Sequence, residues 1–145
     1  MQKSPLSLER YAFSRIHVDA CESPDCQTVK TDGHFRVQTR CQQHGDDLLR
    51  WMVTLNVSVV KKEAESCPPY TFDVEVVGFF KVAEDCPADK QAALVRANGP
   101  AVLFGSVREM IASLTARGPY PRVDLPTVTF IDEAHKKPTA ATAKA

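Results

Sequence analysis

Hydrophobic and polar residues alternate over four segments of this chain, at residues 6–18, 35–41, 51–59 and 70–76. Alternation with a period of two predicts β-strands that bury one face and leave the other in solvent. In the first segment the apolar residues change parity near Ser14, which indicates a β-bulge there. Four strands of this kind predict one antiparallel sheet.

Two helical segments are expected after the strands. Residues 88–97 are compatible with a helix, and the Asn-Gly-Pro sequence at 98–100 is expected to end it. A second helix over 103–114 has apolar residues at three- and four-residue spacing. Residues 123–130 are apolar and extended, which predicts a segment docked at an edge. Strands followed by helices predict an α+β domain with a helix on one side of the sheet.

The size and composition predict a single globular domain. The chain has 145 residues, of which 43% are hydrophobic and 25% charged, so we expect one domain over residues 1–132. Residues 133–145 are rich in alanine, threonine and lysine, which predicts a disordered tail. No apolar run approaches the ~20 residues that cross a bilayer and no signal peptide is recognisable, so we expect a cytoplasmic protein without membrane insertion. A formal net charge of +0 argues against nucleic acid as a partner.

The reactive side chains indicate no catalytic or metal chemistry. The five cysteines are scattered and form no CxxC pair, which predicts reduced thiols. Cys21 and Cys26 could bind zinc only with two further ligands, and no metal site is expected. The candidate further ligands are His17, His34 and His44. Because no phosphate-binding glycine loop, nucleophile motif or HExxH sequence occurs, we expect neither ATP, nor another cofactor, nor an enzyme.

Residues 98–130 carry the most specific pattern, NGPAVLFGSVREMIASLTARGPYPRVDLPTVTF. The pattern resembles the SecB family of protein-export chaperones, which reads approximately P-x-x-LF-x-x-x-RE-x-I-x-x-x-x-x-RG-x-(F/Y)-P over most of this stretch. The first strand and YTFDVEVVGFFKV also resemble their family counterparts, so the resemblance covers residues 6–130. The matching residues include Pro100, Leu103, Phe104, Arg108, Glu109, Ile111, Arg117, Gly118, Tyr120, Pro121, Leu125 and Phe130.

The resemblance implies a fold and an assembly. Members of the family have a four-stranded antiparallel sheet of Greek-key type with a long helix packed on one side. They pair into dimers and then tetramers through strand and helix contacts. A homotetramer built as a dimer of dimers is therefore expected here, with an interface that includes Leu103, Val107, Arg108 and Ile111.

The resemblance also implies a function, that of an ATP-independent holdase for unfolded polypeptides. The expected clients are preproteins for Sec-dependent export, with the SecA motor as a candidate partner. Three alternatives stay open: a SecB-like chaperone that protects an antitoxin, a module of a different class that binds a small apolar ligand or lipid, and a plain structural oligomer.

The residues expected to bind clients are large and apolar, which is also what a hydrophobic core requires. Period two places Asp73 and Glu75 on the solvent face of the fourth strand, where together with Asp19 they are candidates for SecA contact. The client-binding candidates are Val77, Phe79, Phe104, Tyr120, Leu125, Val128 and Phe130.

Overall fold

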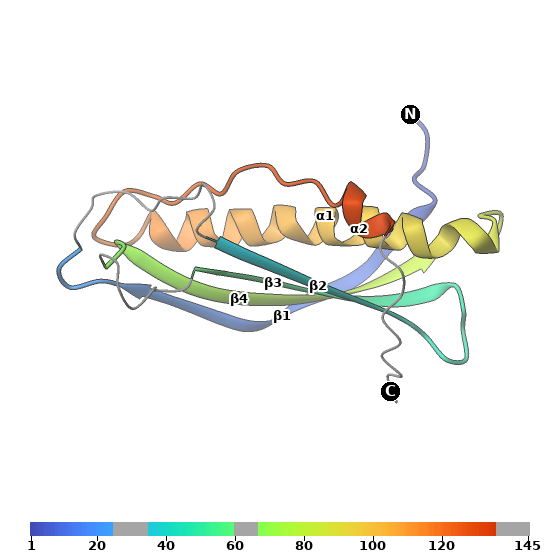
Figure 1. Cartoon of the computed structure of the whole chain (residues 1–145), viewed down its shortest axis with the longest axis horizontal. Coiled ribbons are helices and arrows are strands. Elements are labelled where there is room, and N and C mark those ends of the chain that lie inside the picture. The colour runs from blue at the N-terminus through green and yellow to red at the C-terminus, as the bar shows by residue number, and fades with distance from the viewer. Residues whose placement is uncertain (25–34, 60–66, 136–145) are drawn as a thin grey trace.

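The computed structural model describes residues 1–24, 35–59 and 67–135, which form one sheet with one long helix on it. The strands lie in the order β1-β4-β3-β2, and all neighbours are antiparallel. Helix α1 runs along one face of this sheet (Figure 1). The elements are β1 (Leu6–Ala20), β2 (Phe35–Gln43), β3 (Arg50–Val59), β4 (Tyr70–Val82), α1 (Ala88–Thr115) and α2 (Ile131–Ala134).

This topology confirms the predicted fold class. Three consecutive strands, β2, β3 and β4, are followed in space by β1, which lies beside β4 as in a Greek key. Within the described ranges, no helix is long and apolar enough to cross a bilayer.

Strand β1 contains two bulges. Its register with β4 shifts between Leu8 and Arg10 and again between Phe13 and Arg15. The second shift confirms the bulge predicted near Ser14, whereas the first, at Glu9, was not predicted. Because each bulge adds one unpaired residue, the apolar side chains of β1 stay on the helix side although their parity changes twice.

The hydrophobic core lies between α1 and the two central strands. Gly78 belongs to this face, because a Cβ there would lie 2.7 Å from Cδ2 of Leu103, so the missing side chain lets α1 approach the sheet. Each large apolar side chain buried here contributes roughly 1.5–3 kcal/mol. The buried apolar side chains of the two central strands are Trp51, Val53, Leu55, Val57, Val59, Tyr70, Phe72, Val74, Val76, Phe80 and Val82.

The predicted helix break at residues 98–100 is wrong. Helix α1 continues for 28 residues with Pro100 inside it. An internal proline removes one hydrogen bond and costs about 3 kcal/mol in isolation, but here a single apolar stripe on both sides of Pro100 packs on the same sheet. The stripe advances in steps of four residues through Val95, Gly99, Leu103, Val107 and Ile111.

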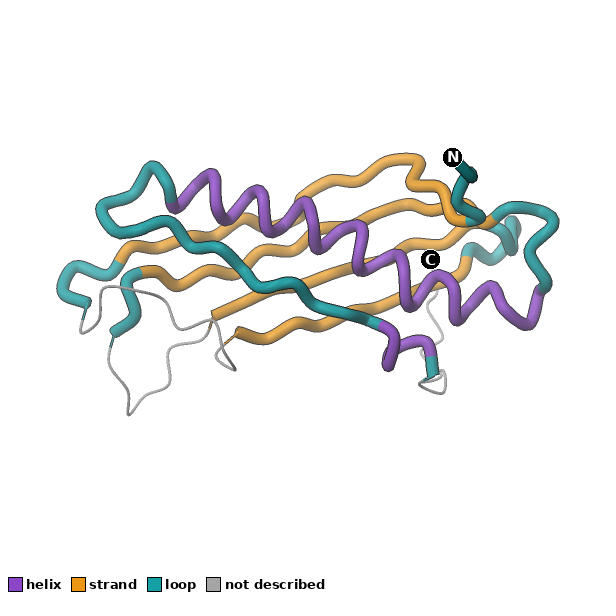
Figure 2. The backbone as a smooth tube through the Cα atoms, turned by 90° about the horizontal axis from the view of Figure 1, so that it is seen from above, coloured by secondary structure: helices purple, strands orange, loops and turns teal. Residues whose placement is uncertain are grey.

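After α1 the chain returns along the same side of the sheet as an extended segment, residues 116–130, which we call the crossover segment (Figure 2). Val123, Leu125 and Phe130 anchor it in the core, so the segment is docked, but it lies over the face of the sheet and not at an edge as predicted (Figure 2). It forms no strand. The short helix α2 follows and includes the first residues of the predicted tail, while residues 136–145 lie outside the described part of the chain.

The prediction of reduced thiols is wrong for one pair of cysteines. Cys21, directly after β1, forms a disulfide with Cys67, three residues before β4. The pair is 46 residues apart in sequence, but antiparallel pairing of β1 with β4 brings the two ends together, and the Cys21 N–H donates to the Pro69 carbonyl at 2.9 Å. Cys41 and Cys86 are free thiols, and Cys26 lies outside the described residues.

Candidate functional site

A hydrogen-bond network fixes the start of the crossover segment on the covered side of the sheet. The Tyr70 hydroxyl lies 3.2 Å from the Thr115 carbonyl and accepts the N–H of Tyr120 at 3.0 Å. The Thr115 hydroxyl donates to the Ile111 carbonyl at 2.7 Å and accepts the Val123 N–H at 2.9 Å. The end of α1, where carbonyls have no partner inside the helix, is thereby joined to β4 and to the returning chain.

Tyr120, a predicted client contact, is part of this junction. Its ring packs edge-on against Tyr70 with centroids 5.6 Å apart, and its hydroxyl donates to the Cys21 carbonyl. A Cβ at Gly118 would overlap the Tyr70 hydroxyl, so only glycine allows the chain to pass so close. Tyr120 therefore has a structural role and keeps only part of its side chain exposed.

Arg108 ties the middle of the crossover segment to α1. Its Nε donates to the Leu125 carbonyl at 3.0 Å. Further along, the rings of Phe104 and Phe130 meet edge-on at 6.1 Å. Leu125, Phe104 and Phe130 are at most 5% exposed, so these three client-binding candidates lie in the core of a single chain.

The residues expected at an oligomer interface are also mostly internal. Leu103, Val107 and Ile111 have no exposed surface because they face the sheet within one chain. Of the four interface candidates only Arg108 keeps surface with which a second copy could interact.

Half-exposed apolar side chains remain on the covered side, along β2 and the crossover segment. Phe35 and Val37 of β2 face the helix layer, since they pair with the buried Val59 and Val57. Figure 2 shows the crossover segment beside α1, over the two strands that continue directly into the grey residues, which are β2 and β3. We call Phe35, Val37, Tyr120 and Val128 the client surface, after the two predicted client contacts among them, Tyr120 and Val128.

Cys41 of β2 lies partly buried beneath the two helices. Burial raises the pKa of its thiol to about 11, while Arg96 of α1 lowers this pKa and Glu133 of α2 raises it. Both helices therefore approach β2 near Cys41, while Phe35 lies at the other end of the strand.

The opposite flank of α1 leaves part of β1 uncovered. Tyr11 and Ile16 pair with Gly78 and Val74, so they belong to the helix-facing side of this edge strand. Their exposed fractions are 48% and 47%. The flank formed by Tyr11 and Ile16 is a second apolar surface, separate from the client surface.

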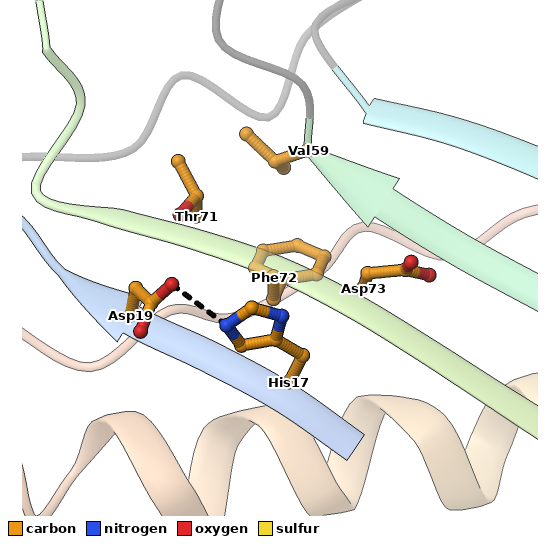
Figure 3. A pocket seen from close by; sticks show the side chains of 6 residues that line it. All are labelled: His17, Asp19, Val59, Thr71, Phe72 and Asp73. Carbon is orange, nitrogen blue, oxygen red and sulfur yellow. Dashed lines mark ion pairs between the residues drawn. The ribbon is translucent and has the colours of Figure 1, made fainter. Parts of the chain in front are cut away.

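The three acidic candidates lie on the open face of the sheet, away from α1. This placement agrees with the period-two prediction for Asp73 and Glu75. Arg15 forms ion pairs with both carboxylates, at 3.0 Å to Asp73 and 3.5 Å to Glu75. His17 Nε2 lies 2.7 Å from Asp19 (Figure 3). The open-face carboxylates thus already have partners from β1.

A shallow hollow of about 190 Å³ lies among these groups. Figure 3 shows His17 and Asp19 on one side of it and Asp73 on the other. A neighbouring hollow of about 550 Å³ extends across to Arg36 and Gln38 of β2. In the described ranges, no three His, Cys, Asp or Glu side chains gather as they would to hold a metal ion, and the Cys21 sulfur is engaged in the disulfide.

Val77 and Phe79, the remaining client-binding candidates, also lie on the open face. The guanidinium carbon of Arg10 lies 4.3 Å from the centroid of the Phe79 ring. These residues are thus on the opposite side of the sheet from the client surface. Arg36 and Arg40 share the open face, as their common parity in a strand with one solvated face predicts, whereas Phe35 and Val37 of the client surface were not among the predicted client contacts.

Comparison with known proteins gives consistent results. The family model described as "Preprotein translocase subunit SecB" matches residues 5–137. The protein-export protein SecB of Actinobacillus succinogenes is 30% identical over 132 residues, which is 89% of this chain and 78% of that protein. The uncharacterized protein MJ0357 of Methanocaldococcus jannaschii is 26% identical over 126 residues, which is 87% of this chain and 80% of that protein.

A solved structure has the same fold. It is the Mycobacterium tuberculosis Rv1957 SecB-like chaperone, in complex with a ChAD peptide from the Rv1956 HigA1 antitoxin. The TM-score is 0.61 at 15% identity, over 86% of this chain and 88% of that one.

Proposed function

Because this chain belongs to the SecB family, we propose that it is an ATP-independent chaperone that holds unfolded polypeptides on its client surface. The observation that carries the proposal is that partly exposed apolar side chains remain on the covered side of the sheet, on β2 and on the crossover segment. Such side chains offer burial to an extended apolar segment without enclosing it. Neither catalysis nor a cofactor is part of the proposed action.

Binding at this surface would depend on apolar burial, which yields about 25 cal/mol per Å². A short segment gains little from one such surface and leaves it quickly. An assembly that repeats the surface raises the effective concentration of the next site and holds a long unfolded chain more tightly. A client that folds withdraws its apolar segments and is thereby released.

The proposal is tested by the aggregation of a reduced, unfolded test protein, followed by light scattering without ATP. We expect suppression at a near-stoichiometric ratio. Val128→Asp should weaken suppression about ten-fold, because a charge is placed where apolar segments bind. Unchanged scattering at several-fold molar excess of the wild type would refute the holdase function.

Val102→Asp is the matched control for this experiment. Val102 is 47% exposed on α1 and is not part of the client surface, so the same change there should leave suppression intact. An equal loss in both variants would move the site away from the crossover segment. Circular dichroism shows whether each variant is folded.

We propose the predicted homotetramer as the working assembly. The uncovered Tyr11 and Ile16 on edge strand β1 support self-association, because exposed apolar residues along a strand edge favour pairing with a second copy. Arg108 remains an interface candidate. A mass of 16.0 kDa by light scattering on a sizing column, at micromolar concentration, would contradict the proposal.

Preproteins for Sec-dependent export are the proposed clients, since several relatives, such as that of Actinobacillus succinogenes, are named protein-export protein SecB. An antitoxin is the second candidate, supported by the peptide in the Rv1957 complex. Delivery to SecA through Asp19, Asp73 and Glu75 would require a basic partner to compete with Arg15 and His17 for these carboxylates. Binding assays with purified SecA and with an antitoxin peptide distinguish the two client classes.

A small apolar ligand is the alternative from another class. Native mass spectrometry separates the cases, since a fixed small mass indicates a ligand and co-purified peptides indicate a chaperone.

We place the protein in the cytoplasm. Because glutathione keeps thiols reduced there, the bond between Cys21 and Cys67 would be open at rest and would form on oxidation.

A further inference from the structure

The open face of the sheet separates its charges into two halves. The pairing register aligns residues of the four strands in rows across the face. The acidic half contains Asp19, Asp73 and Glu75, their partners Arg15 and His17, and Arg36 in the same row as Asp73. The other half, which we call the basic half, consists of two rows and Lys81. The rows are Arg40, Thr54, Val77 and Ala12, followed by Gln42, Met52, Phe79 and Arg10.

The basic half contains cations without acidic partners. Arg10, Arg40 and Lys81 form no ion pair with any residue in the described ranges. Nearby, Arg50 is already paired with Glu9 and Asp47. The centre of the half is mainly apolar, because Met52, Val77 and Phe79 lie with Thr54 on the two strands between Arg40 and Arg10, and Ala12 lies beside Val77.

We propose that the basic half binds an acidic segment of a partner polypeptide, in which an apolar residue lies between two carboxylates. Charge complementarity is the main argument, since opposite charges across an interface speed encounter and exclude partners of the wrong sign. A basic segment would meet Arg10, Arg40 and Lys81 without compensation. The surface lies on the other side of the sheet from the client surface, so occupation of one does not block the other.

The geometry fits an extended segment with a simple pattern. The backbones of β2 and β1 are three strand spacings apart, about 14 Å. Arg10 leans over the Phe79 ring of β4, which brings its charge closer to Arg40. In an extended chain, residues i and i+4 point the same way about 13 Å apart, and residue i+2 lies between them. A segment of the form acid-x-apolar-x-acid would therefore place carboxylates at the two arginines and an apolar side chain on Val77 and Phe79.

A polypeptide suits this half better than a nucleic acid. Nucleic-acid sites align many cations along a phosphate backbone, whereas this half has an apolar centre with three cations around it that form no ion pair within the described part of the chain. The whole chain has a formal net charge of +0. An apolar centre gives no advantage to a phosphate backbone but buries a leucine or phenylalanine side chain.

The test uses two labelled peptides and the full chain. One peptide is Gly-Asp-Ser-Leu-Ser-Asp-Gly, and the other replaces both aspartates by lysine. We expect the acidic peptide to bind at least about ten-fold more tightly at low salt, and this advantage to shrink as salt is added. In the double variant Arg10→Glu with Arg40→Glu the preference should reverse.

The matched control is Arg117→Glu with Arg122→Glu, which changes the total charge equally at exposed positions outside the open face. It should keep the affinity for the acidic peptide within about two-fold. Equal binding of both peptides, or an equal loss in both double variants, would overturn the proposal. So would an oligonucleotide or a phosphatidylglycerol vesicle that displaces the acidic peptide and binds more tightly than it does.

Suppression of aggregation is measured on the same double variants, with circular dichroism to verify that they fold. We expect Arg10→Glu with Arg40→Glu to hold unfolded clients as well as the wild type does. Failure of peptide binding with intact suppression rejects the acidic-partner proposal alone. Lost suppression in the folded variant would overturn its independence from the client surface.

Discussion

The two faces of the sheet differ in what their side chains do, although the same strands build both. On β4, Val74 and Val76 are completely buried beneath α1, while Asp73, Glu75 and Val77 between and beside them lie on the half-exposed open face. The covered face holds the chain together by apolar burial and by hydrogen bonds to the crossover segment. The open face carries charges that the fold does not need.

Energetics support this division. The ion pairs between Arg15 and its two carboxylates join partly exposed side chains, from 28% to 49% accessible. Pairs exposed to this degree contribute about 0–1 kcal/mol each. Charges on the open face can therefore change to suit a partner with little effect on folding, whereas changes on the covered face affect stability first.

The largest expected effect on stability concerns the disulfide that links the end of β1 to the start of β4. Replacing Cys21 and Cys67 by serine removes a cross-link over 46 residues, and chain entropy predicts a loss of about 4 kcal/mol in the free energy of unfolding. Urea denaturation of oxidised protein measures it. Reductant should bring the wild type to the level of the variant and leave the variant unaffected. Cys86→Ser keeps the disulfide, so it should match the oxidised wild type and lose as much stability on reduction. Wild-type protein that is insensitive to reductant would show that apolar burial alone holds this end.

A chemical comparison of the faces comes from adjacent positions on β2. Cys41 faces the helices with its pKa raised to about 11, so its thiolate fraction at pH 8 should be about a hundred-fold below that of an ordinary thiol. Gln42→Cys places a thiol on the open face. In a background with Cys26→Ser and Cys86→Ser, alkylation of Cys41 should be about a hundred-fold slower at pH 8 than alkylation of the thiol introduced at position 42. The rate at Cys41 should increase up to about pH 11. Similar rates at both positions would contradict the burial of Cys41.

The smallest expected difference is a matched pair on β4. Val74→Ala should lower the free energy of unfolding by about 2 kcal/mol, because two carbon atoms leave a closed core. Val77→Ala, the same change on the open face, should cost below about 1 kcal/mol. Thermal or urea unfolding measures both. Equal losses would mean that another molecule covers the open face in the assembled protein.

The sheet was predictable because its signals are local. Period-two alternation located all four strands, and the parity change gave the bulge near Ser14. The continuity of α1 was missed because residues 98–100 carry a strong local breaking signal. An apolar stripe in four-residue steps through Gly99 outweighs this local signal, but its packing energy can be inferred only once the sheet beneath the helix is known. The disulfide was missed for a related reason, since the register of β1 with β4 creates that proximity.

The candidate sites depend even more on neighbours across the sheet. Parity alone gave the face of Asp73 and Glu75, but their pairing with Arg15 requires the register of β1 after its second bulge. Likewise, Phe104 and Leu125 are large and apolar, as client-binding residues would be, so their residue type does not distinguish a client contact from a core position. Their burial follows from the path of the crossover segment, which leaves no alternating pattern in the sequence.

The two bulges of β1 also determine where this strand can change its length. Deleting Glu9 or Ser14 would leave an evenly alternating stretch at that point, with every neighbour still on its own face. Deleting any other single residue of the strand would turn the side chains beyond it to the wrong side of the sheet. Single-residue insertions and deletions among homologues are therefore expected to collect at these two positions, and an alignment that places a gap elsewhere in β1 would exchange inward for outward residues.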